Sequence, residues 1–283
     1  MEITIEFLKD IARAIYDKCH PILGTEKAAE KLQRGAGGDI SRYIDILAEN
    51  IIIDFLESAN HDILLISEEV GEKYIGDKNK AIETQQKIIV DPIDGSNNAI
   101  RGVPFCSVSI AYAVGNSLND LSKGVIIDLI TKDIYWAEKD KGAYLNDNKI
   151  SVSNKDITQN CLLELNLPLR KTLNEWEKYN LIIKRFHRIR VMGSTALTFC
   201  QVAKGSIDAF IDLNDSSRLV DVAAGILILK EAGGGTFSKE GQELRENLSI
   251  HTKFPFVASN AELEPFLKEL LGQINLRNKK KNN

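Results

Sequence analysis

The chain has 283 residues, 43% of them hydrophobic, and a formal net charge of −4 at pH 7. This size can supply the core of one large α/β unit or of two packed halves. The negative net charge argues against a nucleic-acid-binding surface. No apolar run has the length needed to span a bilayer. The N-terminal stretch MEITIEFLKDIARAI lacks a basic leader region and a cleavage-like site, so we expect a cytoplasmic protein.

The cysteines and histidines do not indicate a zinc site or a disulfide framework. The four cysteines form no CxxC pair, and the four histidines are far apart in the sequence. We therefore expect buried free thiols at Cys19, Cys106, Cys161 and Cys200.

The N-terminal segment begins with a predicted helix. Residues 3–18 place apolar side chains on one helical stripe, and the glycine-rich stretch 34–38 predicts a mobile loop. Asp39 then opens a second predicted helix, with Asp45 near its start and one residue beyond the apolar stripe. A lone helical aspartate is usually a solvated surface residue, so the role of Asp45 stays open at this point.

A strand with acids at its end follows. The apolar run 63–66 predicts a strand that delivers Glu68 and Glu69 to one edge of a sheet. We expect one of these side chains to face a site and the other to face away, although paired acids are also common at exposed strand tips. The polar stretch 73–86 predicts a surface loop or hairpin.

The stretch KIIVDPIDGSNN, residues 87–98, carries the strongest chemical signal. Its β-branched residues predict a buried strand, and Pro92 predicts a turn between Asp91 and Asp94 because it donates no hydrogen bond to a ladder. Two carboxylates held about 4–6 Å apart repel each other unless a cation lies between them. Oxygen ligands without His or Cys suit a hard ion such as Mg²⁺.

The end of the same stretch suggests an anion site. Gly95 permits close backbone approach, and Ser96 and Asn97 are good openers of a short helix whose free N–H groups attract anions. Carboxylates, a metal and an anion site together suggest phosphate chemistry. A plain strand-to-helix turn capped by Asp and Asn explains the same residues. An aspartyl-nucleophile phosphatase is disfavoured, because two residues separate the two acids instead of one.

The remaining segments predict a layered α/β (α+β) protein of two related halves. Residues 1–155 form the expected N-terminal half, 156–275 the C-terminal half, and 276–283 a basic tail that we expect to be disordered. An antiparallel meander is predicted first, and short strands and helices then alternate. The predicted strands cover 105–114, 124–129, 133–137, 142–146, 149–152, 188–192, 207–211 and 254–258, and the predicted helices cover 176–185, 197–204, 219–232 and 261–271.

Four motifs combine into one constellation. They are Gly-Asp-x-Ser-x-x-x-Asp at 38–45, Glu-Glu at 68–69, Asp-Pro-Ile-Asp-Gly-Ser at 91–96, and Asp-x-Ala-Ala-Gly at 221–225 with Glu-Ala-Gly-Gly at 231–234. The chain thereby resembles the inositol monophosphatase superfamily of metal-dependent, lithium-sensitive phosphatases, and in detail the archaeal type with dual activity on fructose 1,6-bisphosphate and inositol monophosphate. The resemblance covers nearly the full chain. It implies a five-layer α-β-α-β-α sandwich, usually as a homodimer.

The resemblance also implies the metal ligands. Glu68, Asp91 and the carbonyl of Ile93 match the ligands of a first metal. Asp91, Asp94 and Asp221 match those of a second, with Asp91 bridging the two and Asp94 also close to substrate. The implied cofactor is Mg²⁺, two or three ions per site.

Water activation and phosphate binding are implied by the same match. Asp45 and Ser96 correspond to the pair that orients and deprotonates the attacking water, with Ser where the family often has Thr. The N–H groups of Gly95 and Ser96 match the phosphate cradle. A third, weaker metal would use Glu68 with loop acids such as Asp39.

The substrate side rests on less specific matches. Ser194 and Thr195 lie in the helix-opening substrate segment, and Asp212 takes the place of an acid that hydrogen-bonds substrate hydroxyls. Arg190 and Arg218 are candidates for a second phosphate, because guanidinium groups bind phosphate bidentately. Each is equally compatible with an ordinary surface arginine.

The predicted function is phosphate-ester hydrolysis in carbohydrate metabolism. We expect Mg²⁺-dependent conversion of fructose 1,6-bisphosphate to fructose 6-phosphate, a step of gluconeogenesis, and of inositol monophosphate to inositol, without a covalent intermediate. The alternatives are an inositol-only enzyme, which the long segment between Asp212 and Asp221 disfavours, and a phosphatase of 3′-phosphoadenosine 5′-phosphate. From another class, an inactive metal-binding regulatory protein would need a missing ligand, and none is missing.

Overall fold

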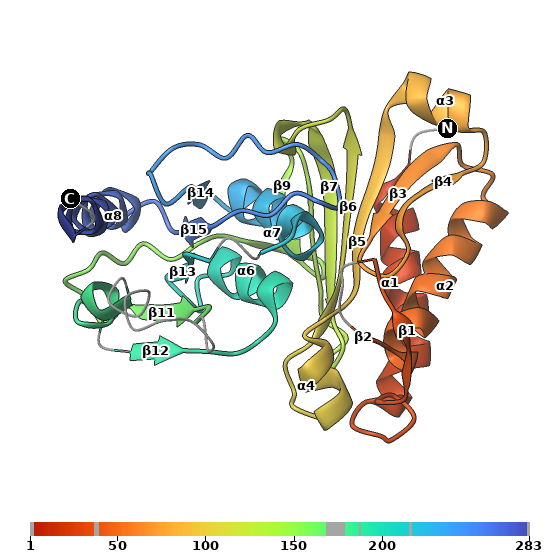
Figure 1. Ribbon diagram of the computed structural model, residues 1–283, viewed down its shortest axis with the longest axis horizontal. Helices are drawn as coiled ribbons and strands as arrows, with labels where there is room; N and C mark the ends of the chain where they lie inside the picture. The colour runs from red at the N-terminus through yellow and green to blue at the C-terminus, as the bar shows by residue number, and fades with distance from the viewer. Residues whose placement is uncertain (1–2, 37–39, 168–178, 187, 215–216, 282–283) are drawn as a thin grey trace.

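The computed structural model describes residues 3–36, 40–167, 179–186, 188–214 and 217–281 (Figure 1). Two sheets carry most strands. The larger has eight, in the order β10-β9-β8-β7-β6-β5-β3-β4, with bounds β3 Ile63–Ser67, β4 Gly71–Ile75, β5 Gln86–Asp94, β6 Ser107–Val114, β7 Leu121–Asp128, β8 Ile134–Glu138, β9 Gly142–Leu145 and β10 Asn148–Ile150. The smaller has five, in the order β12-β11-β13-β15-β14, with bounds β11 Leu162–Leu165, β12 Arg188–Arg190, β13 Ala209–Asp212, β14 Gly235–Phe237 and β15 Phe256–Ser259.

The helices form three layers around these sheets (Figure 1). Their bounds are α1 Ile5–Cys19, α2 Tyr43–Ser58, α3 Lys78–Thr84, α4 Ser96–Arg101, α6 Thr195–Ala203, α7 Leu219–Glu231 and α8 Glu264–Lys281, with a small ladder of β1 Lys31–Arg34 and β2 Ile40–Arg42. Helices α1 and α2 pack on the outer face of the larger sheet, α6 and α7 lie between the sheets, and α8 covers the far face of the smaller sheet. The predicted α-β-α-β-α layering is confirmed.

Strand β5 lies inside the larger sheet and is buried on both faces. Ile88 and Val90 belong to the core under α1 and α2, whereas Ile89 between them belongs to the core around α6 and α7. This explains why β5 reads as a continuous apolar run instead of an alternating one. The predicted end of the ladder before Pro92 is wrong: pairing with β6 continues to Asp94, with a bulge between Asp91 and Asp94. A bulge is one of the few sheet positions that accept proline.

Helix α7 packs unusually close to its neighbours because of two glycines. A Cβ added at Gly124 of β7 would lie 3.1 Å from the Ala224 carbonyl oxygen, and one at Gly225 would lie 2.6 Å from the Phe199 side chain of α6. The missing side chains allow α7 to approach both the larger sheet and α6. These two close contacts help to position the first turn of α7 relative to β5.

Several local predictions differ from the structure. Residues 40–42 are a strand, so α2 begins at Tyr43 instead of Asp39, and the polar stretch 73–86 contains the end of β4 and helix α3. Helix α8 continues to Lys281 where a disordered tail was expected from 276. Of the helix predicted at 176–185, residues 179–183 are helical, and 176–178 lie outside the described residues.

Two predictions about composition can be compared directly. All four cysteines are free and buried, as expected from their spacing. No helix in the described ranges is both long and apolar enough to cross a membrane.

Candidate active site

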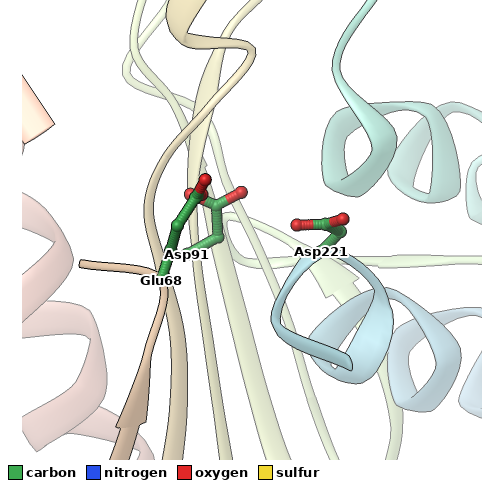
Figure 2. A group of neighbouring side chains, drawn as sticks. All are labelled: Glu68, Asp91 and Asp221. Carbon is green, nitrogen blue, oxygen red and sulfur yellow. The ribbon is translucent and has the colours of Figure 1, made fainter. Parts of the chain in front are cut away.

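Three carboxylates from separate elements meet at one end of the larger sheet. Glu68 follows β3, Asp91 lies on β5, and Asp221 lies in the first turn of α7. Their oxygens include a set of three that all lie within 4.8 Å of one another (Figure 2). Strands β3 and β5 are parallel neighbours with Ser67 opposite Val90, so the next residue of each strand reaches the same edge. We refer to Glu68, Asp91 and Asp221 as the carboxylate cluster.

A cavity of about 470 Å³ opens over the cluster. The predicted catalytic pair and all the predicted ligands of the first two metals line it, together with five of the eight residues predicted for substrate binding. The lining residues among the predicted set are Asp45, Glu68, Asp91, Ile93, Asp94, Gly95, Ser96, Thr195, Arg218 and Asp221. Residues separated by more than 170 positions in the chain therefore share one cavity.

The electrostatics of the cluster favour a bound cation. Burial raises the pKa of Asp91 well above its ordinary value, and the neighbouring carboxylates of Glu68 and Asp94 raise it further. Burial also raises the pKa of Glu68 to about 7, against the lowering effect of Arg218. A site whose donors are all carboxylate or carbonyl oxygens suits Mg²⁺ or another hard divalent ion, which would restore the charged forms. The residues present therefore fit the metal that the sequence implied.

Arg218 supplies a positive charge inside the cluster. Its guanidinium bonds the Glu68 carboxylate, and Nη2 lies 3.0 Å from Oδ1 of Asp221. The side chain is only 18% exposed. The arginine that was expected to bind a second phosphate thus neutralises the proposed metal ligands.

Asp45 and Ser96 lie beside the cluster, on α2 and α4. Oδ2 of Asp45 accepts the Arg42 backbone N–H at 2.9 Å, while Oδ1 is buried and has no hydrogen-bond partner among the described residues. Burial raises the pKa of Asp45 to about 6, with the Arg42 N–H and the Ser96 side chain opposing the shift. The Ser96 hydroxyl donates to the Ile93 carbonyl oxygen at 2.8 Å. One oxygen of Asp45 is therefore available to accept a proton.

Asp94 connects the cavity to α6. Its carboxylate accepts the N–H groups of Thr195 at 3.1 Å and Ala196 at 2.7 Å, together with the Ser194 hydroxyl. These contacts place the carboxylate at the positive end of the helix, although burial still raises its pKa to about 6. Ser194 is buried and holds Asp94, and it lines a smaller neighbouring cavity instead of this one.

Gly95 is required by the turn that follows β5. Its φ of +84° lies in the left-handed region, and an added Cβ would be 3.1 Å from the carbonyl oxygens of Gly193 and Phe105. Only glycine allows this close approach of the α4 and α6 segments. The turn brings Gly95 and Ser96 into the cavity lining, where the sequence predicted a phosphate cradle.

Three predicted substrate residues lie outside this cavity: Ser194, described above, Arg190 and Asp212. Arg190 is exposed on β12, and its guanidinium donates to the Ile189 carbonyl oxygen at 3.0 Å. Asp212 is fully buried, and its oxygens accept hydrogen bonds from Asn166, Asn214 and Ser217. The position expected for hydroxyl recognition therefore serves an internal network. Asp39, expected at a third metal, lies outside the described residues.

Two charged residues of the cavity, Arg42 and Glu69, were not predicted correctly from the sequence. Arg42 lines it and was not considered; its place between Ser41 and Asp45 in the motif at 38–45 was the available signal. Glu69 was expected to face away if Glu68 faced the site, yet both line the cavity. The Ser41 hydroxyl donates to Glu69 and keeps it turned inward.

Comparisons with known proteins agree with this geometry. A family model described as "Inositol monophosphatase family" matches residues 2–274. A fructose-1,6-bisphosphatase/inositol-1-monophosphatase of Methanothermobacter thermautotrophicus is 34% identical over 276 residues, which cover 95% of this chain and 95% of that protein. The crystal structure of an inositol monophosphatase-fructose 1,6-bisphosphatase aligns with a TM-score of 0.81 at 28% identity, over 95% of this chain and 100% of that one.

A second relative has a different name and a different length. A bifunctional NADP phosphatase/NAD kinase of Methanococcus maripaludis is 35% identical over 294 residues, covering 96% of this chain and 49% of the relative. The chain thus spans about half the length of that protein.

Proposed function

This chain belongs to the inositol monophosphatase family, and from that premise we propose that it is a Mg²⁺-dependent phosphomonoesterase acting on sugar and inositol phosphates. The proposed substrates are fructose 1,6-bisphosphate and inositol monophosphate. The dual-named relative from Methanothermobacter thermautotrophicus, which aligns along nearly its full length, supports this substrate class.

The carboxylate cluster is the observation that carries the proposal. Its three oxygens within 4.8 Å suit a shared cation, and Ile93 and Asp94, the other proposed ligands, line the same cavity. Mg²⁺ held there would polarise the phosphoryl oxygens and stabilise the negative charge that develops during hydrolysis.

The protein groups around the cluster have separate roles. The unpartnered Oδ1 of Asp45 accepts the proton of the attacking water, and the Ser96 hydroxyl orients that water. The backbone N–H groups of Gly95 and Ser96 donate to the phosphoryl oxygens. The water oxygen bonds to phosphorus as the bond from phosphorus to the alcohol oxygen breaks. The leaving alcohol takes up a proton from solvent water, and no covalent link to the protein forms.

The bifunctional relative supports a second candidate substrate. Its name includes an NADP phosphatase activity, and its matched part covers 96% of this chain. NADP carries a phosphate monoester on a ribose hydroxyl, which Mg²⁺ bound at the same carboxylates would hold together with the N–H groups. An inositol-only enzyme and a phosphatase of 3′-phosphoadenosine 5′-phosphate remain alternatives.

The test is phosphate release at saturating Mg²⁺ from fructose 1,6-bisphosphate, inositol 1-phosphate, NADP and 3′-phosphoadenosine 5′-phosphate. We expect the first two to have the highest kcat/KM. A clear preference for NADP would replace the proposed substrate class while keeping the chemistry. Release from none of the four, in protein that binds Mg²⁺, would favour the inactive regulatory protein.

The proposal includes a cytoplasmic homodimer, as the family resemblance implies. Light scattering on purified protein checks the assembly: we expect twice the mass of one chain. A monomeric mass would remove that part of the proposal and leave the site unchanged.

A further inference from the structure

A second cavity of about 170 Å³ adjoins the first. Gly193 and Thr195 line both, so a ligand can extend from one into the other past the start of α6. The second cavity is also lined by Glu164 and Asn166 near the end of β11 and by Phe210 of β13. Its volume exceeds by several-fold the roughly 30 Å³ that one water occupies, so it can admit part of an organic ligand.

Glu164 is the unusual residue in this cavity. It is only 3% exposed, and Oε1 accepts the Met192 backbone N–H at 2.6 Å. Oε2 is buried and has no hydrogen-bond partner in the described part of the chain. A buried carboxylate oxygen without a donor is strongly unfavourable. Glu164 also lines the second cavity, so a ligand in that cavity is a source of the missing donor.

The neighbouring protein donors are used elsewhere. The Asn166 amide donates to Asp212 at 2.7 Å, and the Thr198 hydroxyl donates to the Ser194 carbonyl oxygen at 2.7 Å. Arg190 is paired in register with Glu164, but its guanidinium donates to a backbone carbonyl instead. Among these neighbours, none fills the place opposite Oε2.

We infer that Glu164 is a substrate-binding residue whose Oε2 accepts a hydrogen bond from a hydroxyl group on the alcohol portion of the phosphate ester. This inference rests on the proposed function: the phosphate lies over the carboxylate cluster, and the polyol extends past Gly193 and Thr195 into the second cavity. Glu164 then binds a substrate hydroxyl, the role that the family resemblance implied for Asp212. Esters whose alcohol lacks a hydroxyl in this position would bind more weakly.

The test measures ligand binding to an Asp45→Asn variant, which we expect to hydrolyse its substrates slowly. In Asp45→Asn protein with Mg²⁺, calorimetry gives the affinities for inositol 1-phosphate, fructose 1,6-bisphosphate and inorganic phosphate, with and without Glu164→Gln. Gln keeps an oxygen for the Met192 N–H but places an uncharged amide donor at the Oε2 position. We expect affinity for at least one polyol ester to fall about 5–20-fold, because a charged acceptor is lost, while affinity for phosphate stays within about twofold.

Asp208→Asn in the same background is the matched control. Asp208 is also fully buried, but it accepts the Leu162 N–H at 2.7 Å and the Ser153 hydroxyl at 2.6 Å, and it lines neither cavity. We expect it to change none of the three affinities.

Each other outcome has a defined meaning. Equal losses for esters and phosphate would overturn the inference, since they indicate a general disturbance of the site, and so would unchanged affinities for both esters. If the protein binds none of the three probes, the inference and the proposed function both fail. If wild-type protein hydrolyses neither ester but the binding pattern holds, the proposed function fails and the role of Glu164 stands.

Discussion

Asp45 combines a buried, unpartnered oxygen with a pKa raised to about 6, which suits a group that must accept a proton near neutral pH. We predict that Asp45→Asn and Ser96→Ala each lower kcat by about 10²–10⁴-fold. The Mg²⁺ concentration for half-maximal activity should change less than in Asp94→Asn. Steady-state kinetics across a Mg²⁺ titration measures both quantities. If Asp45→Asn acts mainly by raising the Mg²⁺ requirement, Asp45 is part of the metal site and not the base.

Arg218 would compete with a metal ion for the same carboxylates, because it forms ion pairs with Glu68 and Asp221. We predict that Arg218→Gln makes Mg²⁺ bind more tightly, since the internal cation is gone. Without metal, the variant should be less stable than wild type by on the order of 2–4 kcal/mol, because the carboxylates lose their countercharge.

Calorimetric Mg²⁺ titration and thermal unfolding with and without Mg²⁺ decide this second prediction. Arg42→Gln is the control, because Arg42 lines the same cavity but makes no ion pair among the described residues. Weaker Mg²⁺ binding in Arg218→Gln would mean that the guanidinium supports the metal site instead of competing with the metal.

Glu164 should give the stability a measurable pH dependence. Burial raises its pKa from an ordinary value of 4.5 to about 7, against the lowering effects of the Met192 N–H and Arg190. An acid with a raised folded-state pKa contributes stability below its unfolded pKa and loses it as pH rises through the folded pKa.

Glutamine does not ionise, so Glu164→Gln protein does not lose this stability as the pH rises. The free energy of unfolding of the variant minus that of wild type should therefore increase between pH 5 and pH 8, by on the order of 2–3 kcal/mol. Urea unfolding at the two pH values measures the difference. A difference that does not depend on pH would show that Glu164 is as well solvated in the folded protein as in the unfolded chain.

At the scale of elements, the close contact between α6 and α7 sets the position of Asp221. We predict that Gly225→Ala destabilises the protein by about 1–3 kcal/mol, because its Cβ would lie 2.6 Å from Phe199. Gly272→Ala in α8 is the matched substitution: it is also helical but has nothing within 4 Å, so it should stabilise by about 0.5–1 kcal/mol.

Chemical denaturation of the two glycine variants gives both free energies. The Gly225 variant should also need more Mg²⁺ for activity, since α7 carries Asp221 on its first turn. Equal effects of the two substitutions on stability would mean that the α6-α7 contact adapts without strain.

The sequence predicted most elements because their patterns are local. The meander, the stripe of α1 and the apolar strand before Glu68 follow from periodicity and turn residues. The predictions from local patterns are wrong where tertiary contacts determine the secondary structure. Strand β5 continues past Pro92 because a bulge accommodates the proline, and residues 40–42 pair with β1 instead of beginning α2.

At the scale of the whole molecule, the site joins the ends of β3 and β5 to α2 and α7 (Figure 1). The acid-bearing motifs, through the family that they resemble, predicted Asp45, Glu68, Asp91 and Asp221 as neighbours. The pairing of Arg218 with two of these acids and the burial of Asp212 were not predictable, because they depend on side-chain directions that only packing defines. Glu164 was missed because a single glutamate in a strand has no sequence signature.

Restoring Mg²⁺ to metal-free protein tests the central claim, that the carboxylate cluster binds the cation on which hydrolysis depends. Phosphate release from inositol 1-phosphate would be followed as Mg²⁺ is added to wild-type and Asp91→Asn protein treated with chelator. We predict no release before addition and a saturable rise in the wild type. Asp91→Asn should stay inactive at every Mg²⁺ concentration while remaining folded by circular dichroism. Release without divalent cation, or near-normal turnover of Asp91→Asn at saturating Mg²⁺, would contradict the assignment of the cluster as the catalytic metal site.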